Sequence, residues 1–526
     1  MTAEQLPAGA LSPASRLIGL DELRSRTEPL DVLVIGGGVT GAGVALDAAS
    51  RGLSVALVET HDLAFGTSRW SSKLVHGGLR YLASLDVGIA RESAVERHRI
   101  MTVIAPHLVH ALPQVIPVFQ DSSMKSSIAA RLGMMAGDVL RYNAKTPSEV
   151  LARSRRVSAS EAESLCPGIR TDGLRGAVVA HDGQLIDDAR FVVAVARTAA
   201  IHGAIICTYT RATGVTGDGA TLTDVLTGGS FGVRARAVIN ATGVWAGEVD
   251  RAVKLRPSRG THLVVDSASL GSPTGALTVP LGDSISRYVF ALPQQLGRTY
   301  IGLTDVDAPG PIPDEPQPSD DEITLLLDTI NKALARPLTT DDIRGVFAGL
   351  RPLVEEVGPG VTMSTADLSR KHLVAVGDSG LITVVGGKLT TYRKMAEAAV
   401  DEAVTRSGLR ADPCHTSALP LVGATGTPAA SGAPSSLIAR FGAEALHVMD
   451  VAHVSDPAAQ IAPGIDVTRA EIEFAITHEG ACTVDDILAR RTRIALVQED
   501  ADLARDAVTD IASEYGFGRG PVAHPV

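Results

Sequence analysis

DVLVIGGGVTGAGVALDAASRGLSVALVE, residues 31–59, is the stretch that decides the fold. Two apolar runs flank a helical pattern, and glycines follow the first run, which predicts a β-strand–α-helix–β-strand unit. Gly36 allows a tight turn, Gly38 lets phosphates approach the backbone, and Gly41 lets the helix pack on the sheet. The start of the helix favours an anion, and Glu59 can accept hydrogen bonds from a ribose. The unit predicts dinucleotide binding; a βαβ turn without a ligand is the alternative.

The composition restricts the class of protein. A chain of 526 residues is too long for a single core, so two or three domains are expected. The net charge of −11 argues against nucleic acid as the main partner, because phosphate backbones bind basic surfaces. No run of about 18 apolar residues occurs, and residues 1–30 lack a basic segment followed by an apolar core. We therefore expect neither a membrane-spanning helix nor a signal peptide.

The cysteines point to a reducing compartment. They lie far apart in the sequence and form neither a CxxC motif nor a metal-ligand spacing. We expect buried free thiols in a cytoplasmic protein, and no metal site. The four residues are Cys166, Cys207, Cys414 and Cys482.

The order of patterns along the chain predicts its organisation. Residues 1–29 are rich in Ala, Ser and Pro, which predicts a poorly ordered lead-in. Between residues 30 and 408, short apolar runs alternate with helical patterns, which is typical of an α/β body. Residues 409–436 are dense in Pro, Gly, Ala, Ser and Thr and predict a linker. Residues 437–526 show helix-period segments without strand-like runs, so we expect a closing helical domain.

Three further segments suit a flavin better than a nicotinamide. Residues 66–82 supply hydroxyl groups and glycines that let the backbone approach a ring or a phosphate; a polar loop is the alternative. Residues 238–243 form a strand that runs into a small-residue turn. Residues 381–392 repeat the strand–glycine–helix pattern, and a second helix N-terminus suits a ring that gains negative charge. The candidate cofactor residues here are Thr67, Ser68, Ser71, Ser72, Lys73, Gly77, Gly78, Ala241, Thr242, Gly243, Gly387, Lys388, Leu389 and Thr390.

Taken together, these segments resemble the FAD-dependent glycerol-3-phosphate dehydrogenases. The resemblance runs from about residue 30 to 515 in family order. Beyond the 36–59 unit, the matching pieces are SSKLVHGGLRYL at 71–82, NATGVWA at 240–246, GTHLVV at 260–265, GLRPLV at 349–354, GGKLTTYRK at 386–394 and DDILARRTR at 485–493. The resemblance implies a Rossmann-like FAD-binding domain with an inserted mixed-sheet substrate domain and a C-terminal α-helical domain.

The resemblance also implies an activity. It implies oxidation of sn-glycerol 3-phosphate to dihydroxyacetone phosphate by hydride transfer from C2 to FAD, with the electrons passed to a membrane quinone. It further implies peripheral attachment to the inner face of the plasma membrane. We expect the FAD to be held non-covalently, because no His or Cys adjoins the glycine turn.

Cations are expected at the substrate, because a phosphate dianion requires at least one bidentate arginine and usually several positive groups. By resemblance, Arg80, Arg351, Arg370 and Lys388 fall at the substrate pocket, with Tyr81 beside them, and Arg287 also lies in a matching segment. Any one of these arginines taken alone would be read as a surface charge.

Oxidation of an alcohol at carbon requires loss of the hydroxyl proton, so a base is needed. His262 lies at a family pocket position and is the first candidate, although a core histidine in a strand is the alternative. Arg351 could instead polarise the hydroxyl, and Lys388 is a further catalytic candidate. One residue departs from the family: where Gly-Thr-Thr-Asp is common, this chain has Leu303 after Gly302, which removes one hydroxyl from the substrate contacts.

A stripe of apolar residues raises the question of a membrane. Lys125, Arg131 and Arg141 lie in the same segment, which fits an interfacial helix that brings a flavin close to quinone. A core helix or a helix facing a second copy in a homodimer is the alternative. The stripe consists of Met124, Ile128, Leu132, Met135, Val139 and Tyr142.

Three other functions are alternatives to the quinone-linked dehydrogenase. An oxidase would use oxygen and release hydrogen peroxide, and the flavin motifs do not separate the two acceptors. An FAD-dependent amine or amino-acid oxidase shares the cofactor frame, but its substrate needs fewer cations than a phosphate dianion. A flavoprotein without turnover would have a pocket stripped of cations.

Overall fold

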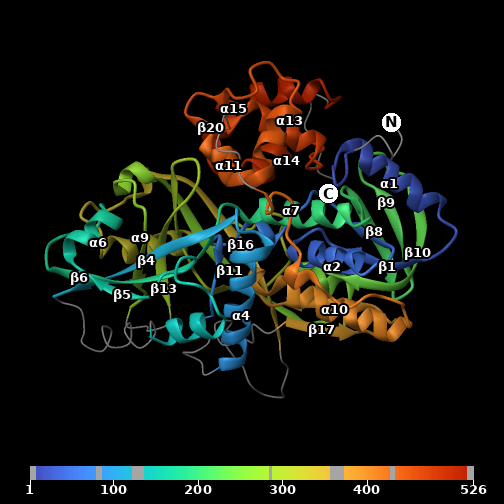
Figure 1. Cartoon of the computed structure of the whole chain (residues 1–526), viewed down its shortest axis with the longest axis horizontal. Coiled ribbons are helices and arrows are strands. Elements are labelled where there is room, and N and C mark those ends of the chain that lie inside the picture. The colour runs from blue at the N-terminus through green and yellow to red at the C-terminus, as the bar shows by residue number, and fades with distance from the viewer. Residues whose placement is uncertain are drawn as a thin grey trace.

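Two β-sheets form the body of the protein, and a group of helices from the end of the chain lies against them (Figure 1). The computed structural model describes residues 7–78, 86–120, 135–282, 287–355, 372–426 and 433–517. One sheet has eight strands and the other has ten, and both mix parallel with antiparallel pairs. The predicted α/β class, with a mixed second sheet and a C-terminal helical domain, is confirmed.

The first sheet is built around the β-strand–α-helix–β-strand unit of residues 31–59. Strands β1 (Leu30–Ile35) and β2 (Val55–Val58) are parallel neighbours, joined through helix α2 (Val39–Ser50). Their side chains are almost entirely buried, as expected for parallel strands covered on both faces. The sheet order is β17-β18-β10-β1-β2-β7, with β8 and β9 paired beside it. The other strands are β7 (Ile205–Cys207), β8 (Thr210–Thr216), β9 (Gly219–Asp224), β10 (Ser230–Asn240), β17 (His372–Val376) and β18 (Ile382–Gly386).

Helices cover both faces of this sheet. Helix α2 shares one buried core with α7 (Asp188–Ile201) and α10 (Tyr392–Ser407). The opposite face contacts α1 (Pro13–Ser25), whose Leu20 and Leu23 are buried against the strands.

Helix α1 shows that the poorly ordered lead-in predicted for residues 1–29 is wrong for residues 7–29. Ser12 accepts a hydrogen bond from the Ser15 N–H, and Pro13 occupies the first helical position, where its missing N–H costs nothing. The residue pair Ser12–Pro13 is therefore a start signal. Residues 1–6 lie outside the described residues.

The second sheet is inserted into the first in two pieces, one between β2 and β7 and the other between β10 and β17. Its longest pairings join β4 to β6 and β11 to β16. Helix α4 (Val87–Arg99) belongs to the first insertion, and helix α9 (Asp320–Asn331) to the second. The strands are β3 (Leu74–Val75), β4 (Val109–Phe119), β5 (Arg155–Val157), β6 (Leu174–Leu185), β11 (Leu255–Asp266), β12 (Ala276–Pro280), β13 (Tyr288–Pro293), β14 (Arg298–Gly302), β15 (Val306–Asp307) and β16 (Ile343–Val354).

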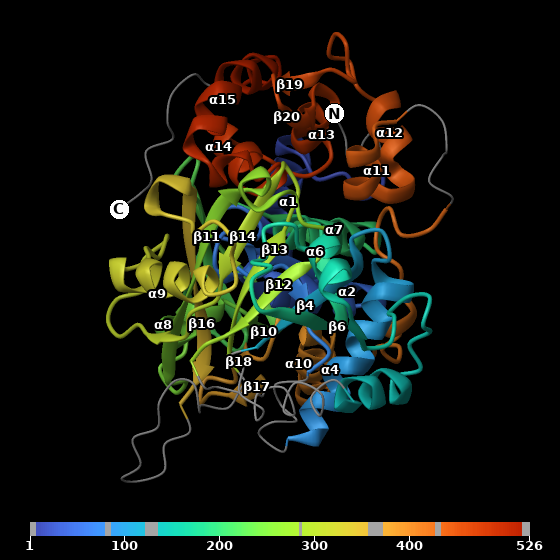
Figure 2. The same ribbon diagram turned by 90° about the vertical axis from the view of Figure 1, so that its left-hand side faces the viewer.

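The C-terminal domain lies on one end of the two-sheet body (Figures 1 and 2). It is mostly helical, but it also contains a two-stranded hairpin of β19 (Gln460–Ala462) and β20 (Ile465–Thr468), which the sequence pattern missed. Before it, Leu409 and Leu421 are buried against the core around α2, so residues 409–426 pack on the body. The helices are α11 (Ser435–Phe441), α12 (Ala445–Asp450), α13 (Arg469–Thr477), α14 (Val484–Asp486) and α15 (Gln498–Ser513).

Candidate active site

One large cavity, of about 1020 Å³, lies at the carboxyl ends of strands β1, β2, β10 and β18. Its lining includes residues that end or directly follow each of these strands, together with residues of the second sheet. Ligands of open α/β sheets bind at this edge, and the volume is at the upper end of the range for small-molecule sites. The cavity therefore has the position and the size for a dinucleotide and a small substrate together.

The glycine turn between β1 and α2 forms one wall. Gly36 has φ +112°, and a Cβ there would lie 2.6 Å from the Ala241 carbonyl oxygen. A Cβ on Gly41 would lie 1.9 Å from the Gly36 carbonyl oxygen, so only glycine allows the helix this close. Gly38 and Thr40 line the cavity at the start of α2, where N–H groups and the helix dipole favour an anion. These features fit a pyrophosphate.

Glu59 occupies the position expected for a ribose contact at the end of β2. Its carboxylate accepts hydrogen bonds from the Gly37 N–H at 2.6 Å and the His61 N–H at 2.9 Å. Burial raises the pKa of Glu59 in spite of these two bonds. Glu59 lines the cavity, and each of its oxygens has a further lone pair that can accept a ribose hydroxyl.

The predicted hydroxyl groups line the cavity, but each already has a partner in the protein. Thr67 donates to the Leu350 carbonyl at 2.6 Å, and Ser68 accepts from the Val39 N–H at 2.9 Å. Ser71 donates to Asp188 at 2.7 Å. The hydroxyls thus hold the segment against three different elements and so shape the cavity wall.

Besides Gly41, which packs α2 close to the glycine turn, two of the predicted cofactor residues do not line the cavity. The Lys73 side chain is buried, and its Nζ donates to the Arg69 and Ser71 carbonyls and to Asp188. Burial lowers the pKa of Lys73 to about 8, although Asp188 opposes the shift. At Gly77, a Cβ would lie 2.1 Å from the Arg97 guanidinium, so this glycine makes room for Arg97. Lys73 and Gly77 therefore stabilise the cavity wall without lining the cavity.

The remaining predicted cofactor residues do line the cavity. Gly78 lines it together with His76, two residues earlier in the sequence. The two turns that follow β10 and β18 contribute the others: Ala241, Thr242, Gly243, Gly387, Lys388, Leu389 and Thr390. The apolar face of α10 is buried, with Tyr392 and Ala396 each 1% exposed.

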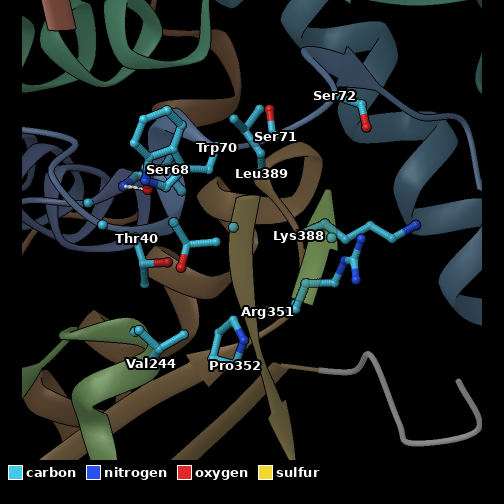
Figure 3. A pocket seen from close by; sticks show the side chains of 18 of the residues that line it. Thr40, Ser68, Trp70, Ser71, Ser72, Val244, Arg351, Pro352, Lys388 and Leu389 are labelled. Atoms are coloured by element: carbon cyan, nitrogen blue, oxygen red, sulfur yellow. Dashed lines mark hydrogen bonds between the residues drawn. The ribbon is translucent and has the colours of Figure 1, made fainter. Parts of the chain in front are cut away.

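Three of the predicted cations lie at the cavity: Arg287, Arg351 and Lys388. Arg351 is on β16, and Arg351 and Lys388 point to the same side of the cavity (Figure 3). The Arg351 guanidinium is fixed by the Thr304 carbonyl at 3.0 Å and by Asp305 at 3.2 Å. Arg80, Tyr81 and Arg370 lie outside the described residues.

His262, the first candidate for the base, does not line the cavity in this structure. The ring is completely buried and does not line the cavity, because it is stacked on Phe347 at 4.7 Å and covered by Gly302. Burial, together with the positive charges of Lys73 and Arg351, lowers the pKa of His262 well below its usual value. Its Nε2 lies 2.8 Å from the hydroxyl of Ser72, which does line the cavity. His262 thus reaches the cavity only through Ser72 in this structure, and its direct contact with substrate stays a prediction.

A different imidazole, His76, lines the cavity, and the sequence reasoning missed it. Its Nδ1 lies 3.2 Å from the Asp182 carboxylate, and its side chain is 37% exposed. Asp182 is fixed in turn by Arg97 at 2.7 Å. Burial alone would raise the pKa of Asp182, but Arg97 and His76 hold it at about 2. A carboxylate that orients an exposed imidazole is the usual arrangement of a general base.

Leu303, the residue that departs from the family pattern, lines the cavity next to Thr304 and Asp305. Its apolar side chain lies close to Gly260, and a Cβ on Gly260 would be 3.0 Å from it. The substrate side of the cavity therefore has an apolar surface where a hydroxyl was expected.

Part of the apolar stripe is described. Met135, Val139 and Tyr142 lie on a helix of residues 135–143 and are 65%, 58% and 77% exposed, so the core alternative is wrong for them. Arg141 of the same helix is buried and donates to the Thr146 carbonyl. Within the described residues, no helix combines the length and the apolar character needed to cross a bilayer. The other stripe positions, Met124, Ile128 and Leu132, and the basic residues Lys125 and Arg131 lie outside the described residues.

Comparison with known proteins agrees with this site. Residues 31–393 match the family described as FAD dependent oxidoreductase, and residues 414–517 match the C-terminal domain of alpha-glycerophosphate oxidase. The chain is 57% identical over 513 residues to glycerol-3-phosphate dehydrogenase 1 of Mycobacterium tuberculosis, covering 97% of this chain and 98% of the relative. It is 38% identical over 521 residues to glycerol-3-phosphate dehydrogenase of Mycobacterium leprae, covering 93% and 85%.

Solved structures have the same fold. A glycerol-3-phosphate dehydrogenase from Bacillus halodurans, complexed with FAD, superposes with a TM-score of 0.72 at 26% identity, covering 97% of this chain and 95% of that one. An L-alpha-glycerophosphate oxidase from Mycoplasma pneumoniae with FAD bound has a TM-score of 0.54 at 18% identity, covering 75% and 99%.

Proposed function

Because the chain belongs to the family of FAD-dependent glycerol-3-phosphate dehydrogenases, we propose that it oxidises sn-glycerol 3-phosphate to dihydroxyacetone phosphate and passes the electrons to a membrane quinone. One observation carries the proposal: a single cavity joins the glycine turn of a dinucleotide site to the cations Arg351 and Lys388 and the imidazole of His76. This set has what a phosphorylated alcohol requires, namely an anchor for the phosphate and a base for the hydroxyl.

Each residue at the cavity has a different role in the proposed reaction. FAD, when bound, accepts a hydride. Arg351 and Lys388 bind the phosphate and orient the carbon that is oxidised. His76 takes the hydroxyl proton as the C2–H bond breaks and the carbonyl forms, and Asp182 holds the ring in place and stabilises the imidazolium. Arg287, at the exposed side of the cavity, adds positive charge that favours entry of an anion.

The cations favour this substrate over an amine or an amino acid. A carboxylate with one negative charge needs fewer positive groups than a phosphate dianion. An apolar residue at position 303 removes one hydroxyl but leaves the cations in place. The amine and amino-acid oxidase alternative is therefore disfavoured, as is a flavoprotein without turnover.

The acceptor is proposed to be a quinone reached at the membrane surface. The exposed side chains of Met135, Val139 and Tyr142 support a peripheral attachment to the inner face of the plasma membrane, with the protein otherwise in the cytoplasm. Oxygen is the other acceptor, and a homodimer contact at the same helix is the other use of these side chains.

The acceptor is tested by turnover of the purified holoenzyme with sn-glycerol 3-phosphate and either a short-chain quinone or oxygen alone. We expect the quinone to be reduced and oxygen uptake to be slow, with little peroxide. Equal or faster turnover with oxygen, with one peroxide for each substrate oxidised, would assign the protein as an oxidase instead.

A further inference from the structure

Three arginines of the C-terminal domain contact the FAD-binding domain. They come from the segment ARRTR, residues 489–493, and they contact residues 60–73, which we call the cofactor loop because much of one cavity wall is made from it. Arg490, Arg491 and Arg493 are 5%, 2% and 2% exposed, and none of them lines the cavity. They therefore act on the cofactor loop from the side that faces away from the ligand.

Asp62 of the cofactor loop receives two of these arginines. Arg491 binds its carboxylate through both terminal nitrogens, at 2.7 and 2.8 Å, and the Arg490 Nε donates at 2.6 Å. The carboxylate is completely buried, yet Arg491 and Arg490 lower its pKa against the effect of burial. Two cations on one buried carboxylate fix both the position and the charge of Asp62.

Arg493 holds the other end of the cofactor loop. Its Nη2 donates to the Arg69 carbonyl at 2.6 Å, and its Nε lies 3.1 Å from Asp187, the residue that caps α7. Arg493 has φ +66°, a conformation that non-glycine residues adopt only where the surroundings enforce it. Arg490 and Arg491 end a π-helical turn, Ile487–Arg491, of a kind that is frequent at functional sites.

The opposite side of the cofactor loop contacts the glycine turn. The Ala64 N–H donates to the Gly37 carbonyl at 2.9 Å, and Ser68 accepts from the Val39 N–H. The loop is thus held between the C-terminal arginines and the turn that binds the pyrophosphate. Displacement of Asp62 would shift Ala64 and Ser68, and with them the cavity wall.

We propose that the C-terminal domain is a cofactor clamp, in which Arg490, Arg491 and Arg493 are positioning residues that keep the cofactor loop in the shape that binds FAD. Docking of this domain and FAD binding then stabilise each other, because coupling between two binding events is reciprocal. The proposal depends on FAD binding, and holds whatever the substrate or the final acceptor is.

The test compares Arg491→Gln and Asp62→Asn with the wild type as full chains. FAD is removed and titrated back, and binding is followed by quenching of Trp70 and Trp245, both of which line the cavity. We expect the FAD dissociation constant to rise about 10-fold, which corresponds to about 1.4 kcal/mol. The increase in Tm that FAD produces should shrink accordingly.

Two matched variants separate a clamp from general stability. Arg440→Gln breaks an equally buried bidentate pair with Glu471 inside the C-terminal domain, and Arg197→Gln breaks a bidentate pair with Glu444 that joins α7 to it. In the described part of the chain, neither arginine forms a hydrogen bond or an ion pair with the cofactor loop. Both variants should have a lower Tm than the wild type but an unchanged FAD dissociation constant.

Two results would overturn the proposal. In the first, Arg491→Gln lowers Tm as Arg440→Gln does and leaves FAD affinity unchanged. In the second, the control variants weaken FAD binding as strongly as Arg491→Gln. If Arg491→Gln does not fold, Arg491→Lys keeps the charge but loses the bidentate contact, and the same comparison of dissociation constants decides.

Discussion

Ser72 Oγ and His262 Nε2 lie 2.8 Å apart, and this contact separates the buried ring from the cavity by one side chain. Because burial and two neighbouring cations lower the pKa of His262, the ring is neutral near pH 7. A neutral ring can hold the Ser72 hydroxyl in one orientation, whereas the exposed ring of His76 is placed to accept a proton. The two histidines therefore have separable roles.

His76→Ala is expected to slow flavin reduction by substrate by about 10² to 10⁴, the range for loss of a general base. His262→Ala should slow it less, by about 10-fold, because that ring acts through Ser72. FAD content should be kept in both variants. Stopped-flow reduction of the flavin measures each rate. A His76→Ala rate equal to wild type, with a large loss in His262→Ala, would return the base role to His262.

Arg351→Ala is expected to reduce kcat/KM by about 100-fold, or roughly 3 kcal/mol of transition-state binding, because the variant loses a charged contact in a partly closed cavity. Steady-state kinetics with sn-glycerol 3-phosphate measure the loss. Arg256→Ala is the control: this residue pairs with Asp307 and does not line the cavity. Unchanged kcat/KM in Arg351→Ala would remove Arg351 from the site.

Asp182→Asn should change the dependence of stability on pH. The pKa of Asp182 is held at about 2, below its unfolded value, so the ionised group stabilises the fold above about pH 4. This contribution, roughly 2 kcal/mol, is lost as the pH falls through 2. We expect Asp182→Asn to have the lower Tm at pH 7 and the difference from wild type to narrow below pH 4. A difference that stays constant down to the acid limit would contradict the ionised Asp182.

Val139 and Tyr142 exchanged together for Asp should release the protein from vesicles that contain anionic lipid. Two buried apolar side chains contribute roughly 3 to 6 kcal/mol, enough to decide whether a peripheral protein stays bound. Activity with a water-soluble acceptor should survive. Leu503→Asp, on the exposed face of α15 in the C-terminal domain, is the matched control and should still sediment with vesicles. Vesicle binding that persists in the double variant, which stays folded, would rule out this surface.

The elements that the sequence predicted correctly are those determined by residues close together in the chain. The turn, helix and second strand of residues 31–59 follow from glycines and apolar runs that act within one unit, and β1, α2 and β2 form there. The turns at 241–243 and 387–390 were found for the same reason. Helix α1 was missed although its start signal, Ser12–Pro13, is equally local.

Contacts between distant residues explain the remaining errors. His76 becomes a candidate base only because Asp182, 106 residues later, pairs with it across β3 and β6. Lys73 was assigned to the cofactor because of its neighbours in sequence, but its ammonium finds Asp188, 115 residues away. His262 was placed in the pocket by the family resemblance, and only the structure shows that its ring is buried and stacked on Phe347. Which of these side chains are buried, and which residues they contact, depends on the whole fold and cannot be read from their neighbours in the sequence.

The central claim is that this cavity oxidises sn-glycerol 3-phosphate with a bound flavin, and anaerobic mixing tests it most directly. The oxidised holoenzyme is mixed with substrate in the absence of oxygen and of any quinone, and flavin absorbance is followed. We predict full bleaching by sn-glycerol 3-phosphate, with one dihydroxyacetone phosphate formed for each flavin, and none by glycerol or amino acids. A flavin that stays oxidised with sn-glycerol 3-phosphate, or is bleached equally by an amino acid, would contradict the account.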